Sequence, residues 1–334
     1  MYKNLWVIIT TINKPTTAIK KFEELSIKFG FHLLIVGDVS TPEVYNKKNY
    51  HYLSINDQNE FLPKLSEKVP TKHYCRKNIG YAFAIANGAE WIFDTDDDNI
   101  PYDEFWEILN SANALTSISS SSRFCNIYKF FSNQNVWPRG LPLDEINAND
   151  YIENSIDPAK GKIQQFLADL EPDVDAIYRL VDNKQIKFDR SENGKLLEKG
   201  TWCPFNSQAT LFHKSMFINL YLPCYVPFRM TDIWRSYVAQ LGLWKKGYNL
   251  SFHAPIVEQY RNEHDFFEDF LDEIQGYENN KSICKALDNL LLDDINDSNI
   301  LTKSYLTLKE FGIIDNREFD IIEEWNSFIL EHIS

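Results

Sequence analysis

The chain has 334 residues and a formal net charge of -14. Hydrophobic residues make up 44% of it and aromatic residues 14%, which is enough for a packed core and excludes a disordered chain. The acidic balance excludes bulk binding to nucleic acid or to an anionic membrane, because such binding relies on basic side chains. An anionic ligand would therefore need local basic groups or a metal ion.

The cysteines and the apolar runs indicate the compartment. Five cysteines are scattered along the chain without a Cys-x-x-Cys pair and without a secretory leader ahead of them. We therefore expect reduced thiols in a cytoplasmic protein. The longest apolar runs, such as residues 33–36 and 82–86, fall far below the length of a membrane span, so no transmembrane segment is expected.

The first hundred residues alternate between strand and helix patterns. Residues 5–12 form a β-branched run of strand length, and residues 16–30 follow with helical spacing. Residues 31–36 predict a second strand and residues 50–55 a short third one. Residues 77–88 predict a helix of small residues that leads into a strand at Trp91. This order predicts a parallel, Rossmann-like nucleotide-binding half.

The strongest chemical signal is an apolar run, residues 91–100, that carries Asp94, Asp96, Asp97 and Asp98 at its end. Ligands of open α/β sheets lie beyond the carboxyl ends of the strands. Clustered carboxylates repel one another unless a divalent cation neutralises them. The run therefore predicts a metal site for a phosphorylated ligand.

The spacing of the acidic run distinguishes between other kinds of site. It fails as a helix-loop-helix calcium loop, because Asn99 stands where Gly is needed and Phe105 where Glu is needed. No G-x-G-x-x-G or P-loop pattern lies near a strand end, so phosphates would be held by a cation and side chains. The remaining alternatives are a solvated loop, or a helix cap in which Asp98 or Asn99 caps a helix beginning near Pro101.

The second half has weaker patterns. Residues 101–115 predict a helix, residues 117–122 form a polar serine tract, and residues 124–131 predict an aromatic strand. Residues 132–165 are loop-rich and residues 182–203 are polar, which is typical of acceptor-facing segments.

Later elements are clearer. Residues 204–212 predict a polar corner entering a short strand, and a helix starts near residues 230–237 and stops at Gly247. Residues 248–253 predict a last strand. From Asp265 onward the chain is acidic and amphipathic, which predicts two or three helices packed against the core.

The order of these motifs resembles that of the GT-A glycosyltransferases. Asp38 ends a strand, a basic-Asn-Gly helix start occupies residues 76–80, the acidic triplet 96–98 has the Asp-x-Asp form, and Asp232 opens a late helix. More narrowly, residues 91–100, 205–208, 232–235 and 261–264 are similar to the STELLO-like family. A more distant similarity is to the reversibly glycosylated polypeptides, or UDP-arabinopyranose mutases. The resemblance covers roughly residues 5–275 and leaves out the C-terminal helices.

The resemblance implies an α/β fold of the GT-A type. This fold has a Rossmann-like nucleotide-binding half and a mixed central sheet with helices on both faces, here with a C-terminal helical extension. We expect a catalytic domain over residues 1–264, divided into a nucleotide-binding half at 1–115 and an acceptor and sugar half at 116–264. Residues 265–334 would form the helical segment.

The resemblance also implies an activity. A metal-dependent glycosyltransferase would move a sugar from a nucleotide-sugar donor, a UDP-sugar, to the hydroxyl of a glycan, lipid-linked or other acceptor. Mn²⁺ or Mg²⁺ would bridge the two phosphates and neutralise the leaving group. Two alternatives stay open: a nucleotide-sugar mutase, and a non-catalytic binding or scaffold protein that kept the fold.

Individual roles follow from the same resemblance. Asp232 is the expected general base for the acceptor hydroxyl, and a plain helix N-cap is the competing interpretation. Asp96 and Asp98 are the expected metal ligands. His264 would complete the shell, with His253 as its alternative, while Asp94 would be structural.

The remaining site residues fall into two groups. The expected nucleotide-binding residues are Thr10, Thr11, Asp38, Arg76, Lys77, Asn78 and Asp96. The expected sugar-binding residues are Asp97, Asp175, Asn206, Ser207 and Gln208. Asp38 is equally well explained as a turn residue. Trp234 and Arg235 are expected in the core, Arg235 in a buried ion pair.

Overall fold

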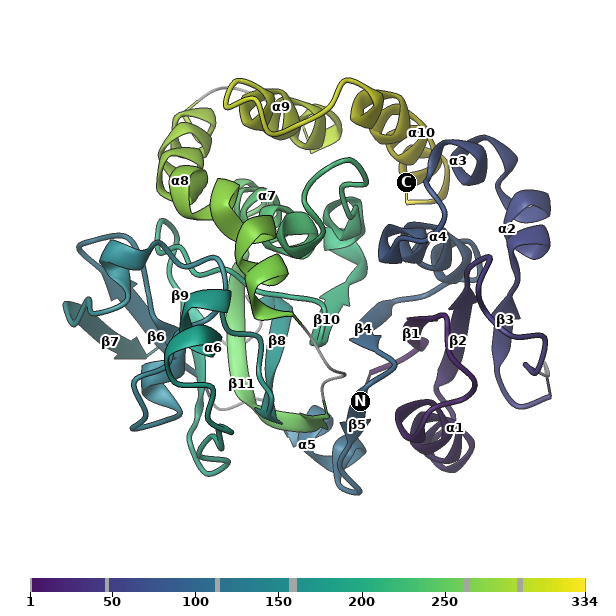
Figure 1. The fold of residues 1–334 in the computed structure, drawn as a ribbon, viewed down its shortest axis with the longest axis horizontal. Coiled ribbons are helices and arrows are strands. Elements are labelled where there is room, and N and C mark those ends of the chain that lie inside the picture. Colours follow the sequence, from purple (N-terminus) through teal and green to yellow (C-terminus); the bar gives the residue numbers. More distant parts are fainter. Residues whose placement is uncertain are drawn as a thin grey trace.

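The computed structural model describes residues 2–45, 48–111, 115–155, 161–260, 265–292 and 297–333. Within these residues eleven strands form one mixed sheet with helices on both faces (Figure 1). The strands are β1 (Leu5–Thr11), β2 (His32–Gly37), β3 (His51–Leu53), β4 (Trp91–Asp96), β5 (Asn99–Pro101), β6 (Leu115–Ser120), β7 (Tyr151–Ser155), β8 (Gly161–Leu170), β9 (Gly194–Leu197), β10 (Ala209–His213) and β11 (Asn249–Gln259). Their order is β3-β2-β1-β4-β10-β8-β11-β9-β6-β7, and β5 pairs with β11.

The helices frame this sheet. They are α1 (Thr17–Phe29), α2 (Ile55–Phe61), α3 (Pro63–Lys68), α4 (Lys77–Ala86), α5 (Phe105–Ser111), α6 (Ala176–Val181), α7 (Thr231–Lys245), α8 (Phe266–Leu290), α9 (Asp297–Lys309) and α10 (Arg317–His332). Among the described residues, every helix is too short or too polar to cross a lipid bilayer.

The first half confirms the predicted parallel, Rossmann-like arrangement of strands. β1 pairs in parallel with both β2 and β4, and β2 pairs in parallel with β3. The hydroxyl of Thr16 caps α1, and Gly30 ends it with a φ of 79° that a residue without Cβ adopts without strain. Because β1 and β4 are adjacent and parallel, their carboxyl ends reach the same edge of the sheet.

The alternation of β1 explains why both faces of the sheet are covered. Trp6 and Ile8 join one hydrophobic cluster, while Val7 and Ile9 join the other. Successive side chains of a strand point to opposite faces, so a continuous apolar run requires burial on both sides. α4 packs against β1 and β2, and α1 packs against β2.

The second half makes the sheet mixed. β10 runs antiparallel to both β4 and β8, whereas β11 runs parallel to β8. β11 is longer than the predicted strand over residues 248–253. Its last residues pair with β5, so the helix predicted to begin at Pro101 begins at Phe105 instead.

Between residues 115 and 131 the structure contains one strand that was not predicted, and one predicted strand was wrong. The serine tract contains β6, which pairs with β7 and β9, and Ser117 donates a hydrogen bond to Glu198 at 2.8 Å. The predicted aromatic strand contains a 3-10 helix, Ile127–Phe130, in which Ile127 and Tyr128 are buried in the core and Phe130 packs against it. Burial explains those aromatic residues, and it does not require a strand.

The acidic tail forms three helices, as predicted. α10 packs against α3 and α4, and α9 packs against α7 and α8. The buried carboxylate of Glu318 accepts hydrogen bonds from the Tyr221 hydroxyl and from the backbone N–H groups of Cys224 and Tyr225, at 2.9 and 2.8 Å for the backbone pair. These bonds attach α10 to the loop that follows β10 and its 3-10 helix Lys214–Leu220.

Candidate active site

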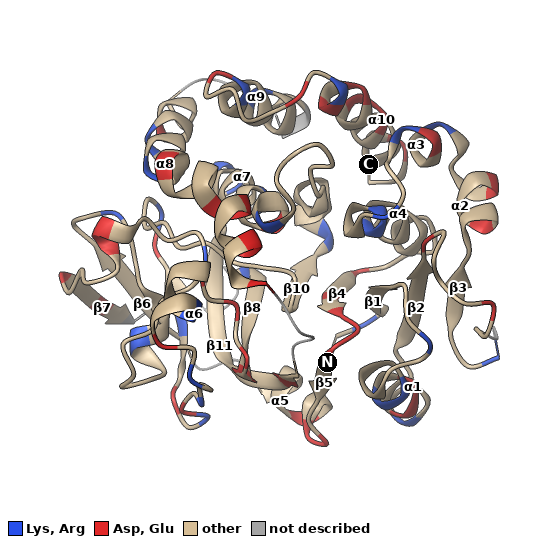
Figure 2. Ribbon diagram, in the orientation of Figure 1, with Lys and Arg blue, Asp and Glu red and all other residues tan. Residues whose placement is uncertain are grey.

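One cavity lies beyond the carboxyl ends of β1, β2 and β4 and is closed on its other side by the second half of the chain. Its volume is about 740 Å³. Ten of the predicted residues line it: Thr10, Thr11, Asp38, Arg76, Asp96, Asp97, Asp98, Ser207, Gln208 and Asp232. The acidic residues at the end of β4 are visible in Figure 2 where the chain turns towards β5. The fold thus brings the acidic triplet, Asp38 and Asp232 to one place.

Four predicted residues do not line this cavity: Lys77, Asn78, Asp175 and Asn206. Asn78 exchanges two hydrogen bonds, both 2.8 Å, with the backbone of Leu222. The Asp175 carboxylate caps α6 through the N–H of Tyr178, and Asn206 accepts from the N–H of Gln208 within the polar corner. His264 lies outside the described residues.

Lys77 binds the end of β4, where the acidic run begins. Its fully buried ammonium contacts Asp94 Oδ1, the carbonyl oxygen of Thr95 and Asp96 Oδ1, each at 2.9 Å. These three acceptors match the three donors of an ammonium group. Asp94 also pairs with the buried Arg235 at 2.8 Å, which confirms both the structural role of Asp94 and the buried ion pair of Arg235.

Asp96 lines the cavity with its side chain about a third exposed. Burial raises the pKa of Asp96 to about 7, and the charges of Asp98 and Asp94 act in the same direction, although Lys77 opposes them. A divalent cation beside Asp96 would compensate the negative charges of Asp96 and Asp98.

Asp97 points towards the end of β1. Its Oδ2 accepts hydrogen bonds from the Thr11 hydroxyl at 2.5 Å and from the Asn13 amide at 3.0 Å. Its backbone oxygen accepts from the Thr16 hydroxyl, also at 2.5 Å. Asp97 therefore connects the acidic turn to the segment between β1 and α1, whereas the Asp98 side chain contacts Gln259 of β11.

The fit of these residues to a divalent cation can be judged from their oxygens. Within the described ranges, no three His, Cys, Asp or Glu side chains converge into an all-protein metal cage. Asp96 and Asp98 are close enough for the charge of one to raise the pKa of the other. Mg²⁺ is commonly held by one or two carboxylates together with substrate phosphates and waters, so this pair fits an open cation site.

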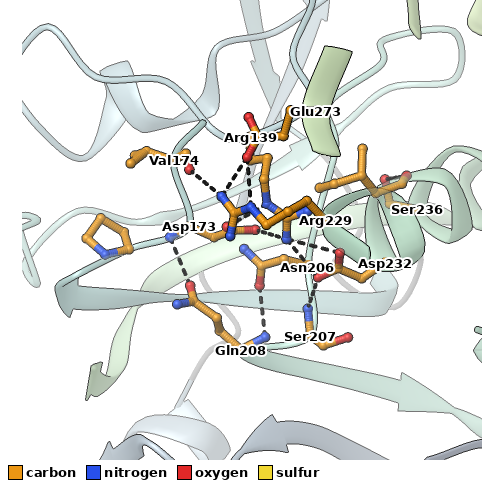
Figure 3. A network of polar contacts seen from close by, with 12 residues as sticks. Arg139, Asp173, Val174, Asn206, Ser207, Gln208, Arg229, Asp232, Ser236 and Glu273 are labelled. Carbon is orange, nitrogen blue, oxygen red and sulfur yellow. Dashed lines mark hydrogen bonds and ion pairs between the residues drawn. The ribbon is translucent and has the colours of Figure 1, made fainter. Parts of the chain in front are cut away.

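Asp232 belongs to a buried network on the opposite wall (Figure 3). Nη2 of Arg139 lies 3.0 and 3.1 Å from its two carboxylate oxygens, and the N–H of Ser207 donates to Oδ2 at 3.1 Å. Arg139 also contacts Asp173 through Nε at 2.8 Å and Nη2 at 2.7 Å. Pairing with these two acids raises the pKa of Arg139 well above its usual value.

The plain N-cap interpretation of Asp232 was wrong. Met230 occupies the N-cap position of α7, and no side chain caps that end. Asp232 lies in the first helical turn, and its backbone N–H donates to the Tyr74 hydroxyl at 3.2 Å. Its carboxylate therefore faces Arg139 and the cavity.

At the end of the cavity formed by the first half, Asp38 directly follows β2. Its two oxygens accept from the backbone N–H groups of Val39 at 2.6 Å and His73 at 3.2 Å, so it also serves as a turn residue. The guanidinium of Arg76 contacts Gln58, Ser66 and the carbonyl oxygen of Val69. Arg76 lines the cavity while its cationic head braces the segment around α2 and α3.

His253 lies in the sheet, outside the cavity lining. Its ring stacks on Phe166 and contacts the Ser251 hydroxyl at 3.0 Å. Burial lowers the pKa of His253 to about 3, which keeps the ring neutral.

The cavity lining also includes residues that the sequence did not indicate, among them Tyr74, Arg139, Asp173, Phe228 and Gln259. Arg139 stands in the segment 132–165, which was predicted only to be loop-rich, and Asp173 lies just beyond it. A buried arginine between two acids leaves no periodic signal in the sequence. Gln259 follows the predicted end of the last strand, so the extra length of β11 concealed it.

Comparison with known proteins identifies the family. The pattern described as STELLO glycosyltransferases matches residues 229–312. Two proteins of Arabidopsis thaliana, named "Probable glycosyltransferase STELLO2" and "Probable glycosyltransferase STELLO1", are 30% and 28% identical to the chain over 274 residues. The aligned part is 76% of this chain. The chain belongs to the STELLO-like family.

The STELLO match corrects one expectation. The resemblance was expected to leave out the C-terminal helices, yet the matched residues 229–312 include α7, α8 and α9. They also include Asp232. The aligned part is only 35% of the length of either STELLO relative.

Proposed function

We propose that this STELLO-like chain is a metal-dependent glycosyltransferase that uses a nucleotide-sugar, a UDP-sugar, as its donor. The observation that carries the proposal is one cavity that holds Asp96, Asp98 and Asp38 on one wall and Asp232 on the other. Family membership supports glycosyl transfer, and the names of both relatives contain the word glycosyltransferase. Hexosyl and pentosyl donors are equally compatible with this proposal.

The donor would lie along the strand ends. In the proposal, Thr10, Thr11 and Asp38 face the nucleoside, and Asp96 with Asp98 holds Mn²⁺ or Mg²⁺ beside the diphosphate. When bound, the cation would neutralise the charge that develops on the departing diphosphate. Lys77 keeps Asp96 in place, because the Lys77 ammonium lies 2.9 Å from Oδ1 of Asp96.

Asp232 would take the proton from the attacking acceptor hydroxyl. A general base must be an acceptor placed within hydrogen-bond reach of that hydroxyl. Arg139 and the N–H of Ser207 orient the carboxylate without neutralising it by proton transfer, since arginine stays charged. The acceptor would therefore enter beside the wall formed by Ser207 and Asp232.

We place the protein in a reducing compartment such as the cytoplasm. All five cysteines are free and buried. This proposal rests on the thiols alone and is independent of the enzymatic one.

Calorimetric titration of UDP and UDP-sugars, with and without Mn²⁺, tests the function. We expect nucleotide binding that depends on Mn²⁺, followed by sugar transfer once an acceptor is present. Interconversion of the ring forms of UDP-arabinose without an acceptor would favour the mutase alternative instead. Failure of every nucleotide to bind with Mn²⁺ would remove the enzymatic proposal and leave a scaffold protein.

A further inference from the structure

Two glutamines connect the two walls of the cavity through hydrogen bonds. Asp98 Oδ2 accepts from Gln259 Nε2 at 2.9 Å, and Gln259 Oε1 accepts from Gln208 Nε2. Gln208 Oε1 in turn accepts from the backbone N–H of Asp173 at 3.0 Å. Since Asp173 pairs with Arg139, and Arg139 with Asp232, one continuous path joins Asp98 to Asp232.

The direction of this path is set by the backbone. An N–H group can only donate, so the N–H of Asp173 requires the oxygen of Gln208 on its side. The carbonyl oxygen of Glu171 accepts from Gln208 Nε2 at 3.3 Å and fixes the same orientation. The Nε2 group of Gln208 therefore donates towards Gln259, and only the side-chain oxygen of Gln259 can accept that bond. The Nε2 group of Gln259 must then face Asp98.

Both glutamines are buried and lie next to the ends of paired strands, Gln208 directly before β10. Gln259 is the last residue of β11 and is in register with Asn99 of β5. The carbonyl oxygen of Gln208 accepts from the Thr95 hydroxyl at 2.6 Å and from the Asn99 amide at 3.0 Å. These contacts attach the pair to β4 and β5, on either side of the acidic turn, so their positions are fixed relative to Asp98.

We infer that Gln208 and Gln259 are positioning residues that hold Asp98 as an acceptor carboxylate for the divalent cation and fix its place relative to Asp232. The inference rests on the proposed function and deepens it. It identifies Asp98, within the triplet 96–98, as the cation ligand whose carboxylate is oriented by an uncharged amide donor. Partners of this kind that orient a metal ligand affect metal affinity about 10- to 100-fold.

The first test replaces the donor that touches Asp98. Gln259→Met removes the amide and keeps a side chain of similar length, and binding of Mn²⁺ is measured in the presence of UDP by the electron paramagnetic resonance of free Mn²⁺. We expect about 10- to 100-fold weaker Mn²⁺ binding. Gln240→Met is the matched control, since Gln240 is fully buried and its side chain bonds Cys203 N and Ser236 O, away from the cavity lining.

The second test reverses the direction of the path without touching Asp98. In Gln208→Glu the side chain cannot donate, so Gln259 would turn its nitrogen towards residue 208 and its oxygen towards Asp98. We expect Mn²⁺ binding to weaken as in Gln259→Met, and the double variant to be no weaker than either single one. Circular dichroism checks the fold, and Gln259→Met alone decides the case if Gln208→Glu does not fold.

The outcomes separate this inference from the proposed function. No UDP-dependent Mn²⁺ binding by the unchanged protein would overturn the proposed function. Binding by the unchanged protein, with Gln259→Met equal to Gln240→Met, would overturn the inference alone. Weaker binding in Gln259→Met combined with unchanged binding in a folded Gln208→Glu would overturn the directional path.

Discussion

Nη2 of Arg139 lies 3.0 and 3.1 Å from the two carboxylate oxygens of Asp232, and the same guanidinium holds Asp173. One buried cation therefore serves two buried acids that come from different segments of the chain. The arrangement keeps Asp232 in a defined orientation at the wall of the cavity. It also makes the stability of this region depend on Arg139.

Replacing Asp232 by asparagine separates catalysis from binding. The side chain keeps its size, but it no longer accepts a proton from the acceptor hydroxyl. We expect kcat of sugar transfer to fall by about 10²- to 10⁴-fold, the range of general-base catalysis. The affinity for UDP with Mn²⁺, measured by calorimetry, should stay within about twofold, because Asp232 faces the acceptor side in our proposal. Unchanged kcat would remove Asp232 from the chemistry.

Replacing Arg139 by methionine leaves Asp173 and Asp232 without their shared cation. Removing one partner of a buried ion pair costs about 3–5 kcal/mol of the free energy of unfolding. Urea denaturation measures this loss. Arg317→Met is the control, since Arg317 forms an exposed pair with Asp315 that is worth about 0–1 kcal/mol. Equal losses in the two variants would contradict the structural role of Arg139.

Asp175 gives the free energy of unfolding a pH dependence. Burial raises the pKa of Asp175 from 3.8 to about 7. Between about pH 4 and 7 the folded state then keeps a proton that the unfolded state releases, so this group makes the protein less stable as pH rises. Asp175 lowers the free energy of unfolding by at most about 1.4 kcal/mol for each pH unit in this range. We expect Asp175→Asn to lack this decrease. Urea denaturation of both proteins at pH 5 and 7 measures the difference, and equal slopes would contradict the assignment.

Glu318 is expected to anchor α10. Glu318→Ala leaves the Tyr221 hydroxyl and the N–H groups of Cys224 and Tyr225 without their acceptor. An unsatisfied buried polar group costs about 1–3 kcal/mol, so the free energy of unfolding should fall by at least about 2 kcal/mol. Glu331→Ala, at an exposed position of the same helix, is the control and should change it by less than about 0.5 kcal/mol. A loss of the same size in the control would contradict the anchoring role.

The sequence predicted best those features that a local pattern encodes. The β-branched runs and helical spacings of the first hundred residues correspond to β1, α1, β2, β3, α4 and β4, because parallel strands buried on both faces must be continuously apolar. The same logic placed Asp38 and Asp96 at strand ends, where the cavity lies. It did not predict β6, since the strand pairing of a serine tract depends on neighbours distant in sequence.

The candidate site was predictable in part for the same reason. Residues at the ends of strands came together, while Lys77 and Arg76, read as a basic helix start, turn their charged heads into the protein. Their direction depends on tertiary acceptors such as Asp94 and Gln58 that no local pattern reveals. Arg139 and Gln259 were missed because their roles arise only from contacts across the sheet.

The most direct test of the account is the position of Mn²⁺ in a crystal grown with Mn²⁺ and a UDP-sugar. Anomalous scattering from manganese locates the cation independently of the protein atoms. We predict a peak between the carboxylate of Asp98 and the diphosphate, with the transferred sugar directed towards Asp232. A nucleotide bound outside the cavity, or a manganese peak away from Asp96 and Asp98, would contradict the account.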